Sequence, residues 1–93
     1  VIVASGAEAN RPRIPGLEKS IEACDYLYGK EVGDKVIIIG GGLSGCEIAY
    51  DLFKKGKTPI IVEMKNDLIA VKGVCLANSS FLRDFFELNK VEW

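Results

Sequence analysis

Residues 36–45 have the sequence VIIIGGGLSG, in which a run of β-branched residues leads directly into a glycine-rich turn. A short, continuous run of this kind is typical of a strand that is buried on both faces of a parallel sheet. The turn carries glycines at positions 40, 42 and 45, which is the spacing G-x-G-x-x-G. Residues 43–55 then repeat apolar residues at helical spacing, so the stretch predicts a strand, a tight turn and a helix in immediate succession.

The expected helix is well defined on its inner face and at its end. Its inner face consists of small and apolar residues, namely Gly45, Ile48, Ala49, Leu52 and Phe53. Lys54 and Lys55 followed by Gly56 are typical of a helix C-terminus, since cations and a left-handed glycine are favoured there. Residues 58–64 predict a second buried strand, and Pro59 lies near its first position, where a missing N–H costs least.

Beyond this second strand, the pattern predicts a loop, a helix and a third strand. We expect residues 66–78 to be mostly loop, and a serine at 79–80 to cap the helix. The inner stripe of that helix comprises Leu82, Phe85, Phe86 and Asn89. We expect Arg83 and Glu87 to pair at i, i+4 on its outer face, and Val91 to open the third strand.

On the N-terminal side of the glycine turn, residues 1–6 predict a strand and residues 11–16 a proline-rich loop. Ser20 is a candidate N-cap for a short helix over 21–28, and residues 29–34 predict another loop. The order strand, helix, strand, helix, strand that starts at the glycine turn is a βαβαβ unit. We therefore predict an α/β fold, a Rossmann-like, three-layer arrangement around a parallel sheet. We expect the unit to be truncated, because the chain starts and stops within apolar β-like runs.

The glycine turn and Glu63 together predict a dinucleotide-binding site. Gly40 allows a tight turn out of the strand, Gly42 lets the backbone approach a pyrophosphate, and Gly45 lets the helix lie close to the sheet. The helix N-terminus offers free N–H groups and a positive dipole end to the phosphates. Glu63 follows Gly40 by 23 positions, and a carboxylate there accepts hydrogen bonds from the adenosine ribose hydroxyls. No Gly-Lys-Ser/Thr follows the glycines, which excludes a Walker phosphate loop, whereas a ligand-free turn of the same shape stays an alternative.

The composition restricts the function further. In 93 residues, 12 Lys and Arg against 13 Asp and Glu leave a net charge of −1, which argues against a nucleic-acid-binding arm. No apolar run is long enough for a membrane span. The chain has no histidine, and Cys24, Cys46 and Cys75 have neither metal-ligand nor redox-pair spacing, so we expect no metal site and a reducing, cytoplasmic location. Cys46 follows the turn, where a helix N-terminus can lower its pKa, but a small packing residue is the favoured interpretation.

Two parts of the chain resemble flavoproteins that have two dinucleotide-binding domains. Val3-Ala4-Ser5-Gly6, followed by Pro12 and Ile14-Pro15-Gly16, resembles the segment that leaves the FAD domain, with Ser5 in place of a threonine. Residues 40–49 and Val62-Glu63-Met64 resemble the nicotinamide domain of that superfamily. Their Gly-Cys-Glu and Glu-Met sequences are most similar to the NADH:flavin oxidoreductases and 2-enoate reductases related to old yellow enzyme. The pyridine nucleotide-disulfide reductases are the near alternative.

The resemblance implies a division of the chain and a set of cofactor contacts. Residues 1–19 would be the exit strand and linker from an FAD domain, and residues 20–93 part of an NAD(H)-binding domain. Glu47 would reach toward the nicotinamide; alternatively, its negative charge would only interact favourably with the positive end of the helix dipole. Gly6 would lie near the FAD site. The full set of candidate cofactor-binding residues is Gly6, Gly40, Gly41, Gly42, Leu43, Ser44, Gly45, Glu47, Glu63, Met64 and Lys65.

The resemblance also implies what lies outside this chain. FAD, FMN and an iron–sulfur cluster would belong to other domains of a parent enzyme. We therefore expect NADH to bind here, hydride to pass to a flavin on a neighbouring domain, and the isolated chain to be inactive. A non-catalytic module that binds NADH or an adenine nucleotide is the alternative function. We also expect strand edges left unpaired by truncation to associate, as in a symmetric homodimer.

Overall fold

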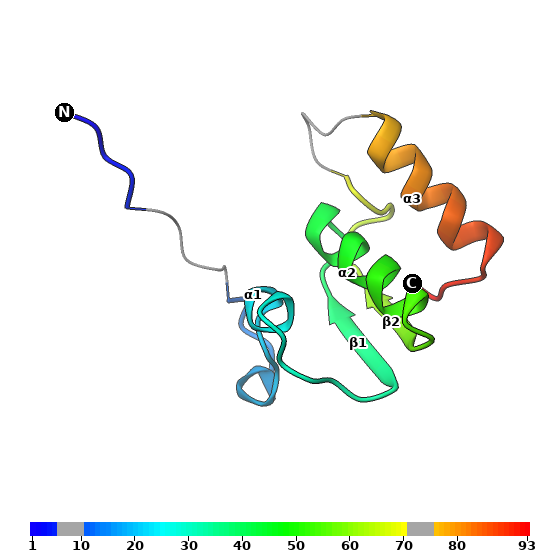
Figure 1. Ribbon diagram of the computed structural model, residues 1–93, viewed down its shortest axis with the longest axis horizontal. Coiled ribbons are helices and arrows are strands. Elements are labelled where there is room, and N and C mark those ends of the chain that lie inside the picture. The colour runs from blue at the N-terminus through cyan, green and yellow to red at the C-terminus, as the bar shows by residue number, and fades with distance from the viewer. Residues whose placement is uncertain (6–10, 71–75) are drawn as a thin grey trace. The chain divides into compact units, whose positions relative to one another are not determined.

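The β-branched run and the residues after the glycine turn form the elements expected of them. Strand β1 (Lys35–Ile39) pairs in parallel with strand β2 (Thr58–Val62), and Ile38 lies opposite Ile61. Helix α2 (Leu43–Lys54) connects the two strands, as Figure 1 shows. The glycine turn therefore lies between the carboxyl end of β1 and the N-terminus of α2.

The computed structural model describes residues 1–5, 11–70 and 76–93. The chain divides into two compact units, residues 1–30 and residues 31–93, and the sheet belongs to the second. Gly6, Gly73 and Cys75 lie outside the described residues.

A single parallel bridge, at the place where the third strand is predicted, lies on the far edge of β2. Glu92 forms a parallel bridge with Ile60, and the Ile61 N–H donates to the Glu92 carbonyl at 3.0 Å. The next residue, Val62, faces the other edge, where its carbonyl accepts the Gly40 N–H at 2.9 Å. β2 therefore lies between β1 and this bridge, which matches the strand order of one half of a Rossmann sheet. The predicted α/β, Rossmann-like class is confirmed.

The core lies on one face of the sheet, beneath α2 and α3 (Leu76–Leu88). Its buried members come from both helices, from β2 and from the loop that follows β2, namely Cys46, Ala49, Leu52, Ile61, Leu68, Ile69, Leu82 and Phe86. Edge-to-face aromatic packing joins the two helices, since the ring centroids of Tyr50 and Phe85 lie 4.8 Å apart. Because the loop after β2 contributes to this core, the carboxyl edge of the sheet is a packed surface.

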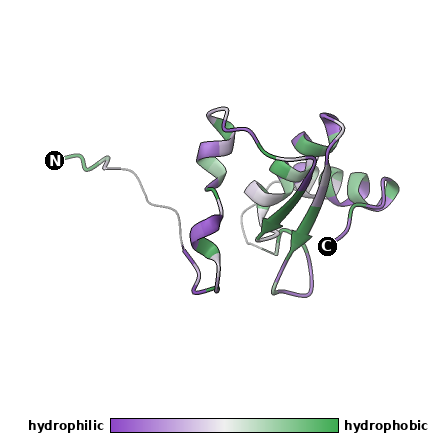
Figure 2. Cartoon of the chain, turned by 90° about the horizontal axis from the view of Figure 1, so that it is seen from below, coloured by the Kyte–Doolittle hydropathy of each residue, from purple (hydrophilic) through white to green (hydrophobic). Residues whose placement is uncertain are grey.

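The other face of the sheet is exposed. Ile37, Ile39 and Val62 are 65%, 47% and 53% exposed, although Figure 2 shows both strands as mostly hydrophobic. The expectation that the first strand is buried on both faces is wrong for the described residues, because α2 and α3 cover the same face. The described residues thus contain two of the three layers of the predicted architecture.

The N-terminal unit differs from the expectation at its strand and its helix. Residues 1–5 are exposed and form no strand, because a strand requires a hydrogen-bonded neighbour and the described residues supply none. Ser20 ends a short 3-10 helix, η1 (Leu17–Lys19), and its hydroxyl donates to the Leu17 carbonyl at 2.6 Å. It is therefore not the N-cap of α1 (Ala23–Leu27); Glu22 holds that position.

Helix α3 also differs from the expectation, at its start and on its outer face. It begins at Leu76, so residues 76–78 are helical and not loop, and Ser79 lies inside the helix with 7% exposure. A small serine fits a crowded helix position, and this packing prevails over its preference for caps. Arg83 pairs with Asp67 at 3.2 Å instead of Glu87, because the loop after β2 lies against that side of the helix.

We expect Leu52→Ala to lower the free energy of unfolding by about 2–5 kcal/mol, because Leu52 is fully buried and the truncation leaves a cavity. The matched control is Leu88→Ala, since Leu88 is 82% exposed, and its effect should stay within about 0.5 kcal/mol. Urea unfolding of the two variants checks this. Similar losses in both would show that the core is not where we place it.

Candidate functional site

The first and third glycines of the motif fix the turn between β1 and α2. Gly40 has a φ of +104°, a backbone conformation that side chains other than glycine rarely adopt. At Gly45, a Cβ atom would overlap the Gly40 carbonyl oxygen, so only glycine allows the helix to lie this close to the strand. These two positions have the geometry that the dinucleotide-binding spacing requires.

Gly42 leaves the N-terminus of α2 open. It is the N-cap of the helix, no side chain caps this end, and the first turn contains no acidic residue. A Cβ atom added at Gly42 would find nothing within 4 Å among the described residues. The uncapped N–H groups and the positive end of the helix dipole can therefore receive an anion that approaches along the backbone.

Gly41, between these positions, is enclosed on all sides. Its N–H donates to Glu63 Oε2 at 2.7 Å, and its carbonyl accepts the Ile69 N–H at 2.7 Å and the Cys46 thiol at 3.5 Å. A Cβ atom would lie only 2.6 Å from Leu68 Cδ2. Gly41 is one of the candidate cofactor-binding residues, but the motif spacing does not predict that it is enclosed. The available signal is that the middle of the three consecutive glycines is not required by the G-x-G-x-x-G spacing.

Glu63 lies directly after β2 and holds its carboxylate against the turn. Besides the Gly41 N–H, it accepts the Lys65 N–H through Oε1 at 2.9 Å. These backbone hydrogen bonds, first from Lys65 and then from Gly41, lower the pKa of Glu63, so the side chain is ionised at neutral pH. A carboxylate has about four lone-pair sites, which leaves it able to accept further hydrogen bonds from a ligand.

The remaining candidate residues lie near the glycine turn and Glu63 and differ in their exposure. Ser44 and Glu47 are exposed on the first half of α2, whereas Leu43 packs partly against the core. Met64 is 93% exposed beside Glu63. The ammonium group of Lys65 donates to the Ala70 carbonyl at 3.4 Å. The structure therefore gathers the glycine turn, Glu63 and Lys65 at the carboxyl edge of the sheet. Gly6, the other candidate, lies outside the described residues.

Cys46 is a packing residue in this structure. Its side chain is fully buried beneath the turn. Burial, followed by the negative charge of Glu63, raises the pKa of Cys46 to about 11. The alternative of a pKa lowered by the helix N-terminus is therefore wrong, because burial of the thiol and the charge of Glu63 raise this pKa.

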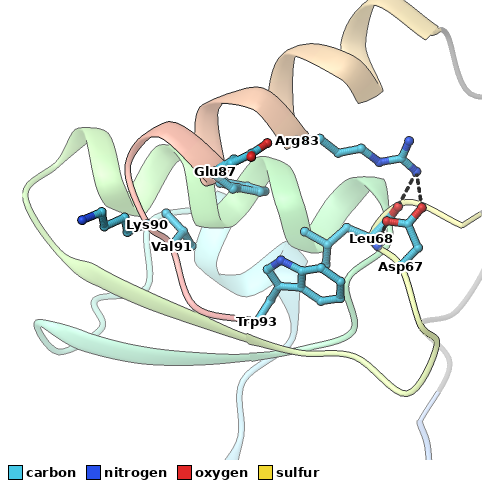
Figure 3. A pocket seen from close by; sticks show the side chains of 8 residues that line it. Asp67, Leu68, Arg83, Glu87, Lys90, Val91 and Trp93 are labelled. Atoms are coloured by element: carbon cyan, nitrogen blue, oxygen red, sulfur yellow. Dashed lines mark hydrogen bonds and ion pairs between the residues drawn. The ribbon is translucent and has the colours of Figure 1, made fainter.

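A pocket of about 330 Å³ lies between the loop after β2, α3 and the C-terminal residues 90–93. Figure 3 shows Arg83 above it, donating to Leu68 and pairing with Asp67, with Trp93 on the opposite wall. None of the predicted cofactor-binding residues lines this pocket.

Residues 1–5, 11–70 and 76–93 contain no group of three or more His, Cys, Asp or Glu side chains that could hold a metal ion. Over the same residues, no helix is both long enough and apolar enough to cross a membrane.

The whole chain is similar to proteins of one known family. The family model for pyridine nucleotide-disulphide oxidoreductases matches residues 1–93. The cinnamate reductase of Clostridium sporogenes is 46% identical over 94 residues, which covers 99% of this chain and 14% of that protein. The NADH oxidase of Thermoanaerobacter brockii is 42% identical over 95 residues, covering 95% of this chain and 14% of that protein. The dihydrolipoyl dehydrogenase of Chlorobaculum parvum is 40% identical over 74 residues, covering 74% of this chain and 15% of that protein.

No solved structure matches the chain at a significant level. The chain spans about one seventh of the length of these relatives, which are 14–15% covered. The superfamily inferred from the glycine turn and Glu63 is confirmed by the family match.

We expect Gly41→Ala to destabilise the protein by roughly 1–3 kcal/mol, because the added methyl group would collide with Leu68 and Glu63. Gly42→Ala adds the same group one residue later into open space, so its effect on stability should be within about 0.5 kcal/mol. Thermal unfolding of both variants checks the contrast. Equal stability of the two variants would contradict the enclosure of Gly41.

We also expect Cys46 to resist alkylation at pH 8 while the exposed Cys24 reacts. The raised pKa of Cys46 stabilises the fold fully below its ordinary value near 9, and this contribution is lost as the pH rises toward 11. Mass spectrometry after brief iodoacetamide treatment of the native protein measures both sites. Modification of Cys46 at a rate close to that of Cys24 would overturn its assignment as a buried thiol.

Proposed function

Because the chain belongs to the pyridine nucleotide-disulphide oxidoreductase family, we propose that it is the NADH-binding part of a flavin-dependent oxidoreductase. Its role is to hold the dinucleotide so that the nicotinamide faces a flavin bound by another part of the same protein. The cinnamate reductase and NADH oxidase relatives, which are oxidoreductases by name, support this class of parent protein.

The turn supplies the contacts for the phosphates. The open N-terminus of α2 presents uncapped N–H groups, and Gly42 has no side chain that would keep a pyrophosphate away. Ser44, exposed in the first helical turn, adds a hydroxyl beside them. Glu47 is exposed on the same helix, and we assign it to the nicotinamide side of the ligand.

Glu63 supplies the contact for the adenosine ribose, and its geometry carries the proposal. Two backbone N–H groups hold the carboxylate at the carboxyl edge of the sheet, and it keeps acceptor sites for the ribose hydroxyls. The same fixed charge disfavours a 2′-phosphate. At ~4–5 Å and an effective dielectric of ~20, two unit charges repel by roughly 3–4 kcal/mol before screening.

Lys65 offsets only part of this repulsion, because its positive charge is a minor cause of the lowered pKa of Glu63, after the backbone hydrogen bonds. It is the nearest cation in sequence, but its ammonium group donates to the Ala70 carbonyl within the same loop. We therefore propose NADH, and not NADPH, as the cofactor. Leu43 and Met64 would flank the ligand with apolar surface.

The chemistry belongs to the bound groups, since a nicotinamide carries a hydride and a flavin accepts it. The residues of this chain bind and orient the dinucleotide, and they include no proposed catalytic residue. We propose that residues 1–19 link this NAD(H)-binding part, residues 20–93, to an FAD domain. FMN and an iron–sulfur cluster would belong to still other parts of a cytoplasmic parent enzyme.

We expect the full-length protein to prefer NADH to NADPH roughly ten- to hundredfold in kcat/KM, because the charge of Glu63 opposes the 2′-phosphate. Glu63→Gln removes this charge and should bring the ratio within a few-fold of unity. Steady-state kinetics with both cofactors measure the change.

The matched control for charge is Glu31→Gln, since Glu31 is an exposed glutamate of the same unit, and it should leave the ratio unchanged. Equal use of both cofactors by the unmutated protein would refute the role of Glu63. Tight binding of ADP, with no NADH turnover in the full-length protein, would instead support a non-catalytic adenine-nucleotide module.

A further inference from the structure

Arg83 of α3 ties the loop after β2 to the helix. Its Nη2 donates to the Leu68 carbonyl at 2.6 Å and lies 3.2 Å from Asp67 Oδ2 (Figure 3). The other carboxylate oxygen of Asp67 accepts the Leu68 N–H at 2.8 Å. One guanidinium nitrogen therefore fixes both the backbone and the acidic side chain at the point where this loop turns inward.

The residues that Arg83 fixes are those that press against the glycine turn. Leu68 and Ile69 are 2% and 3% exposed. The Leu68 side chain lies so close to Gly41 that a Cβ atom there would collide with it. The Ile69 N–H donates a hydrogen bond to the Gly41 carbonyl. A continuous set of contacts thus runs from α3 through residues 67–69 to the turn.

Ile69 holds its place in a strained conformation. Its φ is +53°, in the left-handed region that β-branched residues strongly disfavour. Such a residue keeps its conformation only when its surroundings enforce it. Release of the loop would let Ile69 relax and break its hydrogen bond to the Gly41 carbonyl. Gly41 would then be free to rotate, and its N–H would no longer orient the Glu63 carboxylate.

We propose that Arg83 is a positioning residue for cofactor discrimination: by clamping residues 67–69 from α3, it holds Gly41 and Glu63 in the geometry that favours NAD(H) over NADP(H). This inference rests on the proposed function. Arg83 acts through the loop and does not touch the ligand.

Its role in global stability should be small. The side chains of Arg83 and Asp67 are 38% and 59% exposed, and ion pairs of this exposure contribute little to folding. The Nε atom of Arg83 is also buried without a hydrogen-bond partner, which disfavours an arginine as a stabilising device. A lysine would retain the positive charge and a donor without burying this atom.

The test is calorimetric titration of the full-length protein with NAD⁺ and NADP⁺. In Arg83→Gln the side chain is too short to reach the loop, and we expect the Kd ratio of NADP⁺ to NAD⁺ to fall at least about fivefold, which corresponds to about 1 kcal/mol. Arg83→Lys should restore more than half of the preference on a logarithmic scale. Asp67→Asn should also lower the Kd ratio of NADP⁺ to NAD⁺. If Arg83→Gln does not fold, the ratio of Asp67→Asn tests the proposal in its place, and an unchanged ratio would overturn it.

Lys90→Gln is the matched control, because Lys90 lines the same pocket and carries the same charge; its ratio should equal that of the unmutated protein. A purely structural role would lower the melting temperature of Arg83→Gln and leave the Kd ratio unchanged, which would overturn the proposal for Arg83 alone. An equal fall in the ratio for Lys90→Gln would also overturn it. Unmutated protein that binds neither dinucleotide would overturn the proposed function as well.

Discussion

The hydrogen bond from the Gly41 N–H to the Glu63 carboxylate joins the ends of the two strands, and much of the surrounding structure depends on it. It spans 2.7 Å between residues that are 22 positions apart in the chain. It holds the negatively charged Glu63 carboxylate near the open N-terminus of α2. The carboxyl edge of the sheet therefore presents N–H donors from the helix and carboxylate acceptors from Glu63. A ligand that carries both phosphates and hydroxyls matches this pairing of donors with acceptors.

The need to satisfy buried backbone groups explains why the loop after β2 folds over the turn. Gly41 is buried, so both its N–H and its carbonyl require partners. Glu63 and Ile69 supply them, and Ile69 adopts a disfavoured backbone conformation to do so. Because the folded state lowers the pKa of Glu63, its contribution to stability is present above its ordinary pKa and is lost as the pH falls through the lowered value.

The sequence pattern was sufficient for β1, α2 and β2 and for the tight turn at the glycines. β1, α2 and the position of Glu63 could be predicted because each depends on local sequence. These local features are the β-branched run at 36–39, the glycine spacing and the acidic residue that follows the second strand. The lack of a strand at residues 1–5, the position of Ser20 at the end of η1 and the start of α3 could not be predicted, because strand pairing and the packing of Ser79 depend on distant partners. Arg83 was expected to pair within its helix, since helical spacing contains no information about the loop that lies against it. The strained Ile69 had no local signal at all.

We propose that Glu63, held by Gly41, recognises the adenosine ribose. A crystal structure of the full-length protein with NADH tests it most directly. Our account predicts that the Glu63 carboxylate lies within about 3.2 Å of at least one ribose hydroxyl, with the Gly41 hydrogen bond intact and the pyrophosphate at the N-terminus of α2. A ribose bound elsewhere, with Glu63 turned away from it or released from Gly41, would contradict the account.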